Sequence, residues 1–148
     1  MPVSGSRISS ARILIVDDNA LGLAARRSVL QELGHRVHTC SSPQDALEQC
    51  KAHDFDLVIT DYRMPQMDGT QFIQELRKDH PDIPVILISG FTDALGLSES
   101  STGADVVIQK SAQEVARLIR AVNRLVKPAK KPPRGANGAS SDGGRRRA

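Results

Sequence analysis

Short apolar runs alternate along the chain with segments whose apolar residues recur at helical spacing. Runs rich in Val, Ile and Leu predict four β-strands, at about Arg12–Val16, Asp56–Thr60, Val85–Ile88 and Asp105–Ile108, and a further short strand is expected at about Arg36–Cys40. The segments between them have the length and spacing of helices. This alternation predicts an α/β protein with a parallel sheet.

Capping residues indicate where the first two helices begin or end, and apolar spacing marks the third. Asn19 is a candidate N-cap for the first helix and Gly34 a left-handed stop; its expected apolar face is Ala25, Val29 and Leu33. Ser42-Pro43 opens the second helix, which should bury Ala46, Leu47 and Cys50. Apolar residues then mark a third helix that ends near Asp79, namely Phe72, Ile73 and Leu76.

The last two predicted helices differ in strength. The segment Phe91–Thr102 is expected to be the fourth helix, but its Gly and Ser content makes it a poor one. The final helix is the clearest in the chain. Ser111 and Glu114 match a capping box, and a continuous apolar stripe follows, formed by Val115, Leu118, Ile119, Val122, Leu125 and Val126.

Composition and charge set the expected domain organisation. The 148 residues are within the range of one domain, and with 3% aromatics and no Trp its core must be aliphatic. From Lys127 onward, seven basic residues stand against one acidic residue, a net charge of +6; the formal total of +3 leaves −3 before it. We therefore expect a disordered N-terminus at 1–11, a folded domain at 12–126 and a disordered basic tail at 127–148. No segment has the apolar length of a signal peptide or membrane span, so a cytoplasmic location is expected.

Polar side chains close four of the five strands. Asp17 and Asp18 follow the first strand, Asp61 follows the third, Ser89 the fourth and Lys110 the fifth. Ligands of open α/β sheets bind at the carboxyl ends of the strands, so these side chains should meet at one rim. Three carboxylates gathered there are poorly tolerated without a cation, and oxygen ligands suit Mg²⁺.

In this order and spacing, the motifs resemble a response regulator receiver domain. They are the Asp-Asp pair after the first strand, Asp61 with Met64-Pro65-Gln66-Met67-Asp68-Gly69 after the third, Ser89 and Lys110. The resemblance covers about Arg12–Val126. It implies a flavodoxin-like, doubly wound, five-stranded parallel sheet of strand order 2-1-3-4-5 with five helices.

The resemblance also implies a role for each rim residue. Asp61 would be the phosphoacceptor, receiving a phosphoryl group from a sensor histidine kinase, a histidine phosphotransfer protein or a donor such as acetyl phosphate. Mg²⁺ would be held by Asp17, Asp18, Asp61 and the backbone carbonyl of Arg63. Lys110 and the Ser89 hydroxyl would stabilise the charge that develops on the transferred group. The implied activity is a stand-alone phosphorylation switch or phosphorelay intermediate with autodephosphorylation, rather than a turnover enzyme.

Three departures from the family pattern fall on its usual output face. Position 107 is Val where the family usually has Tyr or Phe, and Ser111 stands where Pro is most common. The Ser89–Gly103 segment is one residue shorter than expected. We still expect a downstream protein partner to bind through the 91–126 face, and homodimer formation stays open. On phosphorylation, the weak helix Phe91–Thr102 should become ordered or displaced without an aromatic rotamer change.

Two other functions fit parts of the sequence. A basic-tailed protein that binds nucleic acid or another anionic surface would use the +6 tail, giving salt-sensitive, sequence-independent binding. No aromatic residue interleaves with the tail's basic residues, so base stacking and specific nucleic-acid binding are not expected. A flavin-binding module could share the fold, but Asp17 and Asp18 would repel a flavin phosphate. The four histidines and two cysteines lack metal spacing and are interpreted as packing or surface residues.

Overall fold

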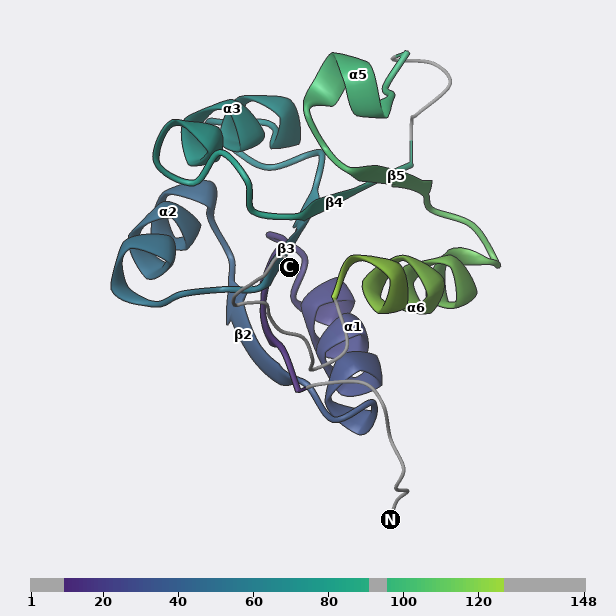
Figure 1. The fold of residues 1–148 in the computed structure, drawn as a ribbon. Helices are drawn as coiled ribbons and strands as arrows, with labels where there is room; N and C mark the ends of the chain where they lie inside the picture. The colour runs from purple at the N-terminus through teal and green to yellow at the C-terminus, as the bar shows by residue number, and fades with distance from the viewer. Residues whose placement is uncertain (1–9, 91–95, 127–148) are drawn as a thin grey trace, which may run out of the picture. The chain divides into compact units, whose positions relative to one another are not determined.

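The computed structural model of the protein describes residues 10–90 and 96–126. Its centre is a sheet of five parallel strands in the order β2-β1-β3-β4-β5 (Figure 1). The strands are β1 (Arg12–Val16), β2 (Arg36–Cys40), β3 (Leu57–Asp61), β4 (Val85–Ser89) and β5 (Val106–Gln109). The predicted parallel sheet and strand order are confirmed. The third, fourth and fifth strands each end one residue later than predicted, at Asp61, Ser89 and Gln109.

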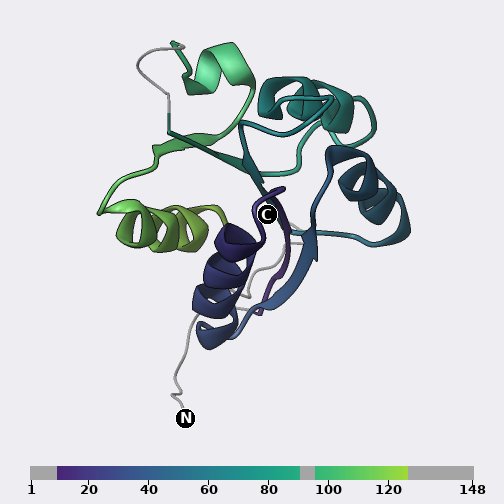
Figure 2. The ribbon, with the colours of Figure 1, turned by 180° about the vertical axis from the view of Figure 1, so that it is seen from behind.

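Helices cover both faces of this sheet (Figures 1 and 2). On one face lie α1 (Ala20–Glu32) and α6 (Glu114–Leu125); on the other lie α2 (Pro43–Ala52), α3 (Gly69–Asp79) and α5 (Glu99–Thr102). The described residues thus contain the five helices that the family resemblance implies. Among these helices, none is both long and apolar enough to cross a membrane.

The predicted ends of the first two helices are set by capping side chains and by one glycine with a positive φ. The Asn19 side chain accepts a hydrogen bond from the amide of Gly22, and Gly34 has a φ of 96°, as a left-handed stop requires. Ser42 caps α2 through the amide of Asp45. These local signals do not depend on distant contacts, which is why they could be predicted from sequence.

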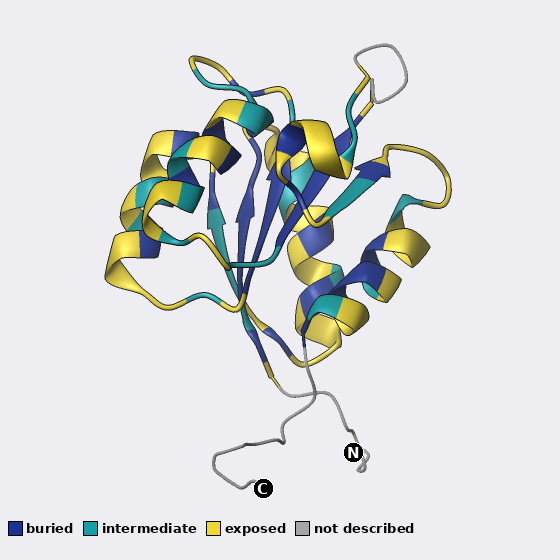
Figure 3. Cartoon of the chain, turned by 45° about the horizontal axis from the view of Figure 1, so that its top comes forward, coloured by how far each residue is buried: buried dark blue, intermediate teal, exposed yellow. Residues whose placement is uncertain are grey.

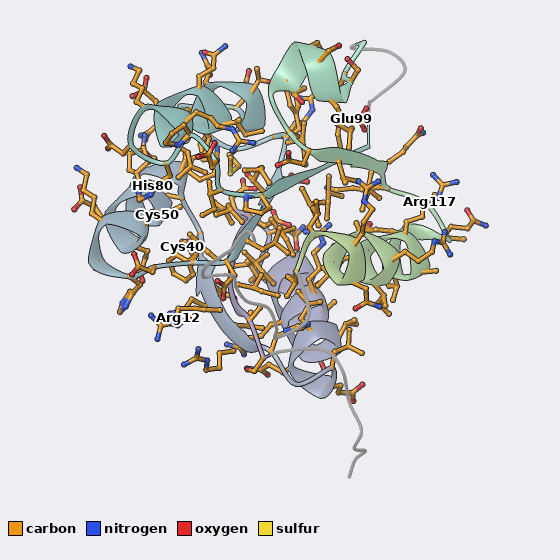
Figure 4. The ribbon with its side chains drawn as sticks, viewed as in Figure 1. Arg12, Cys40, Cys50, His80, Glu99 and Arg117 are labelled. Atoms are coloured by element: carbon orange, nitrogen blue, oxygen red, sulfur yellow. The ribbon has the colours of Figure 1, made fainter. Side chains whose placement is uncertain are left out.

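The core is aliphatic and lies on both sides of the sheet (Figure 3). Every residue of β3 and β4 is buried, as the apolar runs predict. Cys40 on β2 and Cys50 on α2 are buried, and burial raises the pKa of each thiol to about 11 (Figure 4). At that pKa the thiols stay protonated at neutral pH, which agrees with their predicted role in packing.

The predicted apolar face of α1 is wrong by one residue. Ala25 and Leu33 are exposed and Val29 is half-buried, whereas Arg26 and Leu30 are the buried residues of this helix. The i, i+4 spacing of apolar residues misled because it passes over a charged residue that the fold buries. Arg26 is instead held inside by carboxylates of other elements, as described below for the candidate site.

The start of α6 also differs from its prediction. The capping box is absent: Ser111 Oγ accepts from the amide of Gln113, while the Glu114 carboxylate forms an ion pair with Arg26. Val115 is 50% exposed, so it does not belong to the buried stripe. The remaining predicted positions of the stripe that lie in α6 are buried or half-buried, namely Leu118, Ile119, Val122 and Leu125.

The predicted fourth helix is much shorter than expected where it is described. Residues 91–95 lie outside the described part of the chain, and Gly96 has a φ of 64°, which is not helical. Helix α5 begins at Glu99 because the Ser98 side chain accepts a hydrogen bond from the amide of Ser101, and it ends at Gly103 with a φ of 83°. Within the described part of this segment, residues 96–102, the poor helix former gives one capped turn.

A buried histidine holds the residue that precedes β1. Ala11 is buried, and its amide donates a 3.1 Å hydrogen bond to Nδ1 of His35. His35 is 5% exposed, and its Nε2 has no hydrogen-bond partner within the described residues. Burial lowers the pKa of His35, while nearby Asp56 opposes this shift. The native state therefore keeps this ring neutral.

This buried ring predicts a loss of stability in mild acid. The unfolded chain binds a proton near pH 6.5 that native His35 resists, so the free energy of unfolding should fall as the pH drops from 7 towards 5. The contribution has a limiting slope of about 1.4 kcal/mol per pH unit. His35→Gln should flatten the dependence measured by urea unfolding, while His80→Gln should not. Equal slopes for wild type and His35→Gln would contradict this.

Candidate functional site

Three carboxylates meet where β1 and β3 end side by side. Val16 is in register with Thr60, so Asp17 and Asp61 follow directly on neighbouring strands. One carboxylate oxygen from each of Asp17, Asp18 and Asp61 lies within 4.8 Å of the others. The predicted meeting of these three acids at one rim of the sheet is what the structure shows.

A pocket of about 610 Å³ opens over these acids. Besides the three carboxylates it is lined by Lys110, by the Asn19 cap and by the loop after β3 from Tyr62 to Pro65, together with Asp68. Arg63, whose carbonyl was predicted as a metal ligand, therefore lies at the pocket. Ser89 is buried at the end of β4 and does not line the pocket, although its carbonyl accepts a hydrogen bond from the amide of Lys110 at 2.9 Å.

Asp61 is a buried acid with a raised pKa. The residue is 4% exposed, and desolvation by burial raises the pKa of its carboxyl, with Asp17 adding to the rise. The Lys110 ammonium lies 2.9 Å from Oδ1 and opposes that rise. The Lys110 ammonium is the one partner of Oδ1 among the described residues, which contribute no other donor to this oxygen. A buried anionic oxygen in this state favours a further cation.

Asp17 is also buried, and its charge is balanced by a residue that sequence reasoning missed. Its Oδ2 accepts a 2.7 Å hydrogen bond from Nη1 of Arg26, and its Oδ1 accepts one of 2.9 Å from the amide of Asn19. The same guanidinium reaches Glu114 on α6 through Nε at 3.0 Å. The sequence offers little signal for this pairing, because Arg26 is followed by a second arginine, Arg27, and by Ser28.

The loop after β3 is held against the site by Gly69. Asp68 caps α3 by accepting from the amide of Gln71, whose side chain accepts in return from the amide of Asp68. The Gly69 amide donates to the carbonyl of Tyr62 at 2.7 Å. A Cβ at Gly69 would lie 2.8 Å from the carbonyl oxygen of Asp61, so only glycine allows this close approach.

The oxygen-only ligand set fits Mg²⁺ better than a transition metal. Carboxylate and carbonyl oxygens are the ligands Mg²⁺ prefers, whereas zinc sites use His and Cys. Asp18 is exposed and Asp61 has an oxygen whose one partner among the described residues is Lys110, so both can accept a cation. Asp17 can do so only by sharing or releasing one of its two present partners.

Val107, which stands where the family usually has Tyr or Phe, takes part in a contact between β5 and α5. Val107 is half-buried, and its amide donates to the Glu99 carboxylate at 3.1 Å, which ties α5 to β5 (Figure 4). The buried Thr102 hydroxyl donates to the Ser98 carbonyl at 2.6 Å. The described part of the segment that was expected to switch is therefore anchored through α5. Its first five residues, 91–95, lie outside the described residues.

Comparison with known proteins is consistent with this architecture. A family model of the response regulator receiver domain matches residues 13–123. The cyclic di-GMP phosphodiesterase response regulator RpfG of Xanthomonas campestris is 42% identical over 81 residues, which are 52% of this chain and 21% of that protein. The chain spans less than half the length of such curated relatives.

Solved structures show the same fold at nearly full length. A chemotaxis response regulator of Vibrio cholerae is 25% identical with a TM-score of 0.71, covering 79% of this chain and 99% of that one. The response regulator TrrA of Thermotoga maritima, solved in complex with Mg²⁺ and BeF, is 30% identical with a TM-score of 0.70, covering 78% and 98%. The flavodoxin-like fold inferred from the motifs is confirmed. The chain belongs to the response regulator receiver domain family of two-component signalling.

Proposed function

We propose that the protein is a phosphorylation switch in which Asp61 accepts a phosphoryl group. The observation that carries this proposal is the environment of Asp61, a buried carboxylate with a hydrogen-bond-deficient oxygen beside two acids and a lysine ammonium. A structural aspartate would have its oxygens satisfied by hydrogen bonds. An anion kept under-satisfied at the floor of an open pocket is instead available as a nucleophile.

The chain's residues would act on the transferred group as follows. A carboxylate oxygen of Asp61 attacks phosphorus, the bond from phosphorus to the donor's histidine nitrogen breaks, and an acyl phosphate forms on Asp61. The Lys110 ammonium, 2.9 Å from Asp61, would pair with the phosphoryl oxygens, and the Ser89 hydroxyl would donate to them. Asp17, Asp18, Asp61 and the Arg63 carbonyl would hold Mg²⁺, which when bound neutralises charge on the phosphoryl oxygens.

The partners follow from the same proposal. The phosphoryl donor would be a sensor histidine kinase or a histidine phosphotransfer protein. The domain would act by itself, through a protein partner at the 91–126 face or by passing the phosphoryl group to another histidine. The Mg²⁺ and BeF complex of TrrA, a relative at 30% identity, supports a metal-dependent phosphoryl site of this kind.

Phosphorylation by a small donor tests the proposal directly. The protein is incubated with acetyl phosphate and Mg²⁺ and its intact mass is measured; we expect one added phosphate. The adduct should be absent when EDTA replaces Mg²⁺, and hydroxylamine should remove it, because an acyl phosphate is cleaved by this nucleophile and a phosphoserine is not. An adduct that forms equally well with EDTA or resists hydroxylamine would refute the proposal.

A second prediction concerns the metal in the absence of phosphate. Because the clustered carboxylates lack a full set of positive partners, Mg²⁺ should bind the native state and raise its melting temperature. We expect a measurable rise at millimolar Mg²⁺ for wild type and none for Asp17→Asn/Asp18→Asn. Asp82→Asn, on the loop before β4, serves as a control that keeps the response. A wild-type protein insensitive to about 10 mM Mg²⁺ would count against the site.

A further inference from the structure

A buried arginine bridges the acidic site and the start of α6, and the phosphotransfer chemistry above does not use it. Arg26 is 7% exposed, with Asp17 bound to Nη1 at 2.7 Å and Glu114 bound to Nε at 3.0 Å. These partners come from the end of β1 and the first residue of α6, which lies beside α1 on one face of the sheet (Figures 1 and 2). One side chain thus connects the site to a helix 88 residues away in sequence.

Both oxygens of Asp17 already accept hydrogen bonds, one of them from a guanidinium, so a metal ion that binds this carboxylate must share it with a resident positive charge or displace that partner. The partner on Oδ1 is the backbone amide of Asn19, which is fixed at the N-cap of α1. The partner on Oδ2 is the Arg26 side chain, which has rotatable bonds and a second carboxylate within reach. Arg26 is therefore the partner that can yield.

The helix is shaped to accommodate this pair. Gly22 lies one turn before Arg26 on α1, and a Cβ there would be 2.8 Å from Oδ2 of Asp17 and 3.5 Å from Nη1 of Arg26. A contact under 3 Å would force the carboxylate to move. The absence of a side chain at position 22 therefore leaves room for the pair beside the acidic site.

We propose that Arg26 is a resident counter-cation of the metal site, which competes with Mg²⁺ for Asp17 and shifts towards Glu114 when Mg²⁺ binds. The proposal rests on the metal role of Asp17 proposed above. It gives Arg26 a positioning role: without metal it holds Asp17, and with metal its contact with α6 changes. Binding of Mg²⁺ therefore changes the contacts of the first turn of α6. Competition from Arg26 also lowers the affinity of the site for Mg²⁺.

Substitution of Arg26 tests the competition through binding alone. Mg²⁺ is titrated into the protein by calorimetry without any phosphoryl donor. Arg26→Met removes the charge but keeps much of the length, and should tighten Mg²⁺ binding by about tenfold or more, because a cation close to the site no longer repels the metal. Arg26→Lys keeps the charge and should stay within about threefold of wild type. A purely structural role predicts unchanged or weaker binding for Arg26→Met, which would overturn the proposal.

Glu114→Gln gives an independent test with the opposite sign. When Arg26 leaves Asp17 it needs a second carboxylate, since a buried unpaired guanidinium is costly. Losing Glu114 should therefore weaken Mg²⁺ binding by about threefold or more, while Glu48→Gln on the exposed side of α2 should not. This variant decides the question if Arg26→Met does not fold without Mg²⁺. Unchanged or tighter binding in Glu114→Gln would overturn the proposal.

Hydrogen exchange adds a readout of the coupling. Mg²⁺ should change amide protection in the first turn of α6 in wild type, and this change should disappear in Arg26→Met. Wild type distinguishes the two proposals. If it neither binds Mg²⁺ nor takes up phosphate, the proposed function fails; if it does both while the Arg26 and Glu114 variants behave like wild type, only the counter-cation role fails.

Discussion

Asp61→Asn is expected to abolish phosphate uptake while leaving the fold intact. The amide is nearly isosteric with the carboxylate, but it is not a nucleophile and forms no acyl phosphate. Intact mass after incubation with Mg²⁺ and acetyl phosphate should show one phosphate on wild type and none on the variant. Asp68→Asn, which keeps a capping side chain at α3, is the matched control and should still be labelled. Labelling of Asp61→Asn at the wild-type level would place the acceptor elsewhere.

The same substitution should stabilise the protein when Mg²⁺ is absent. Burial raises the native pKa of Asp61 above its unfolded value, so the ionised carboxylate opposes folding at neutral pH. Asp61→Asn removes this cost and should raise the free energy of unfolding at pH 7. As the pH falls towards the native pKa, wild-type Asp61 becomes protonated and the gain should shrink. Urea unfolding across this range checks the sign, and a variant less stable than wild type at pH 7 without Mg²⁺ would contradict it.

Gly69→Ala is expected to damage both the fold and the site. A Cβ at this position would meet Leu87 Cδ1 at 2.6 Å, the Asp61 carbonyl oxygen at 2.8 Å and Tyr62 Cα at 2.9 Å. Two of these atoms are backbone, so relief requires a shift of the residues that carry the site. Overpacking of this kind costs about 1–3 kcal/mol.

Gly90→Ala is the matched control, because its nearest contact would be an ordinary 3.9 Å to Lys110 Cδ. Urea unfolding should show a loss for Gly69→Ala and a change within about 0.5 kcal/mol for Gly90→Ala. The rate of phosphate uptake by the folded fraction should also fall for Gly69→Ala. Equal stability and uptake in the two variants would mean that the loop after β3 accommodates a side chain freely.

The order of the elements and the acidic rim could both be predicted from local sequence patterns. Four of the five strands contain short apolar runs, and the pattern is clearest for β3 and β4, which are buried at every residue. Once the strands are parallel, their carboxyl ends share one edge, so Asp17, Asp61 and Lys110 had to come together. Caps such as Asn19 and Ser42 are equally local, because each binds an amide three residues away.

Sequence reasoning failed where a residue's role depends on what packs against it. The predicted face of α1, Ala25, Val29 and Leu33, follows apolar spacing and passes over Arg26, which with Leu30 is buried in this helix. Glu114 was read as a capping residue because its spacing from Ser111 fits a capping box. Both assignments used only local neighbours.

The roles of Arg26 and Glu114 depend on the packing of α1 beside α6, which no local pattern contains. Packing of the two helices on one face of the sheet brings Arg26 between Asp17 and Glu114, and a buried guanidinium is stable only when both its charge and its donors are matched. The need for glycine at position 69 likewise arises from the approach of β4 and the end of β3. A local pattern specifies elements and their ends, while contacts between distant segments specify which charges are buried and where no side chain fits.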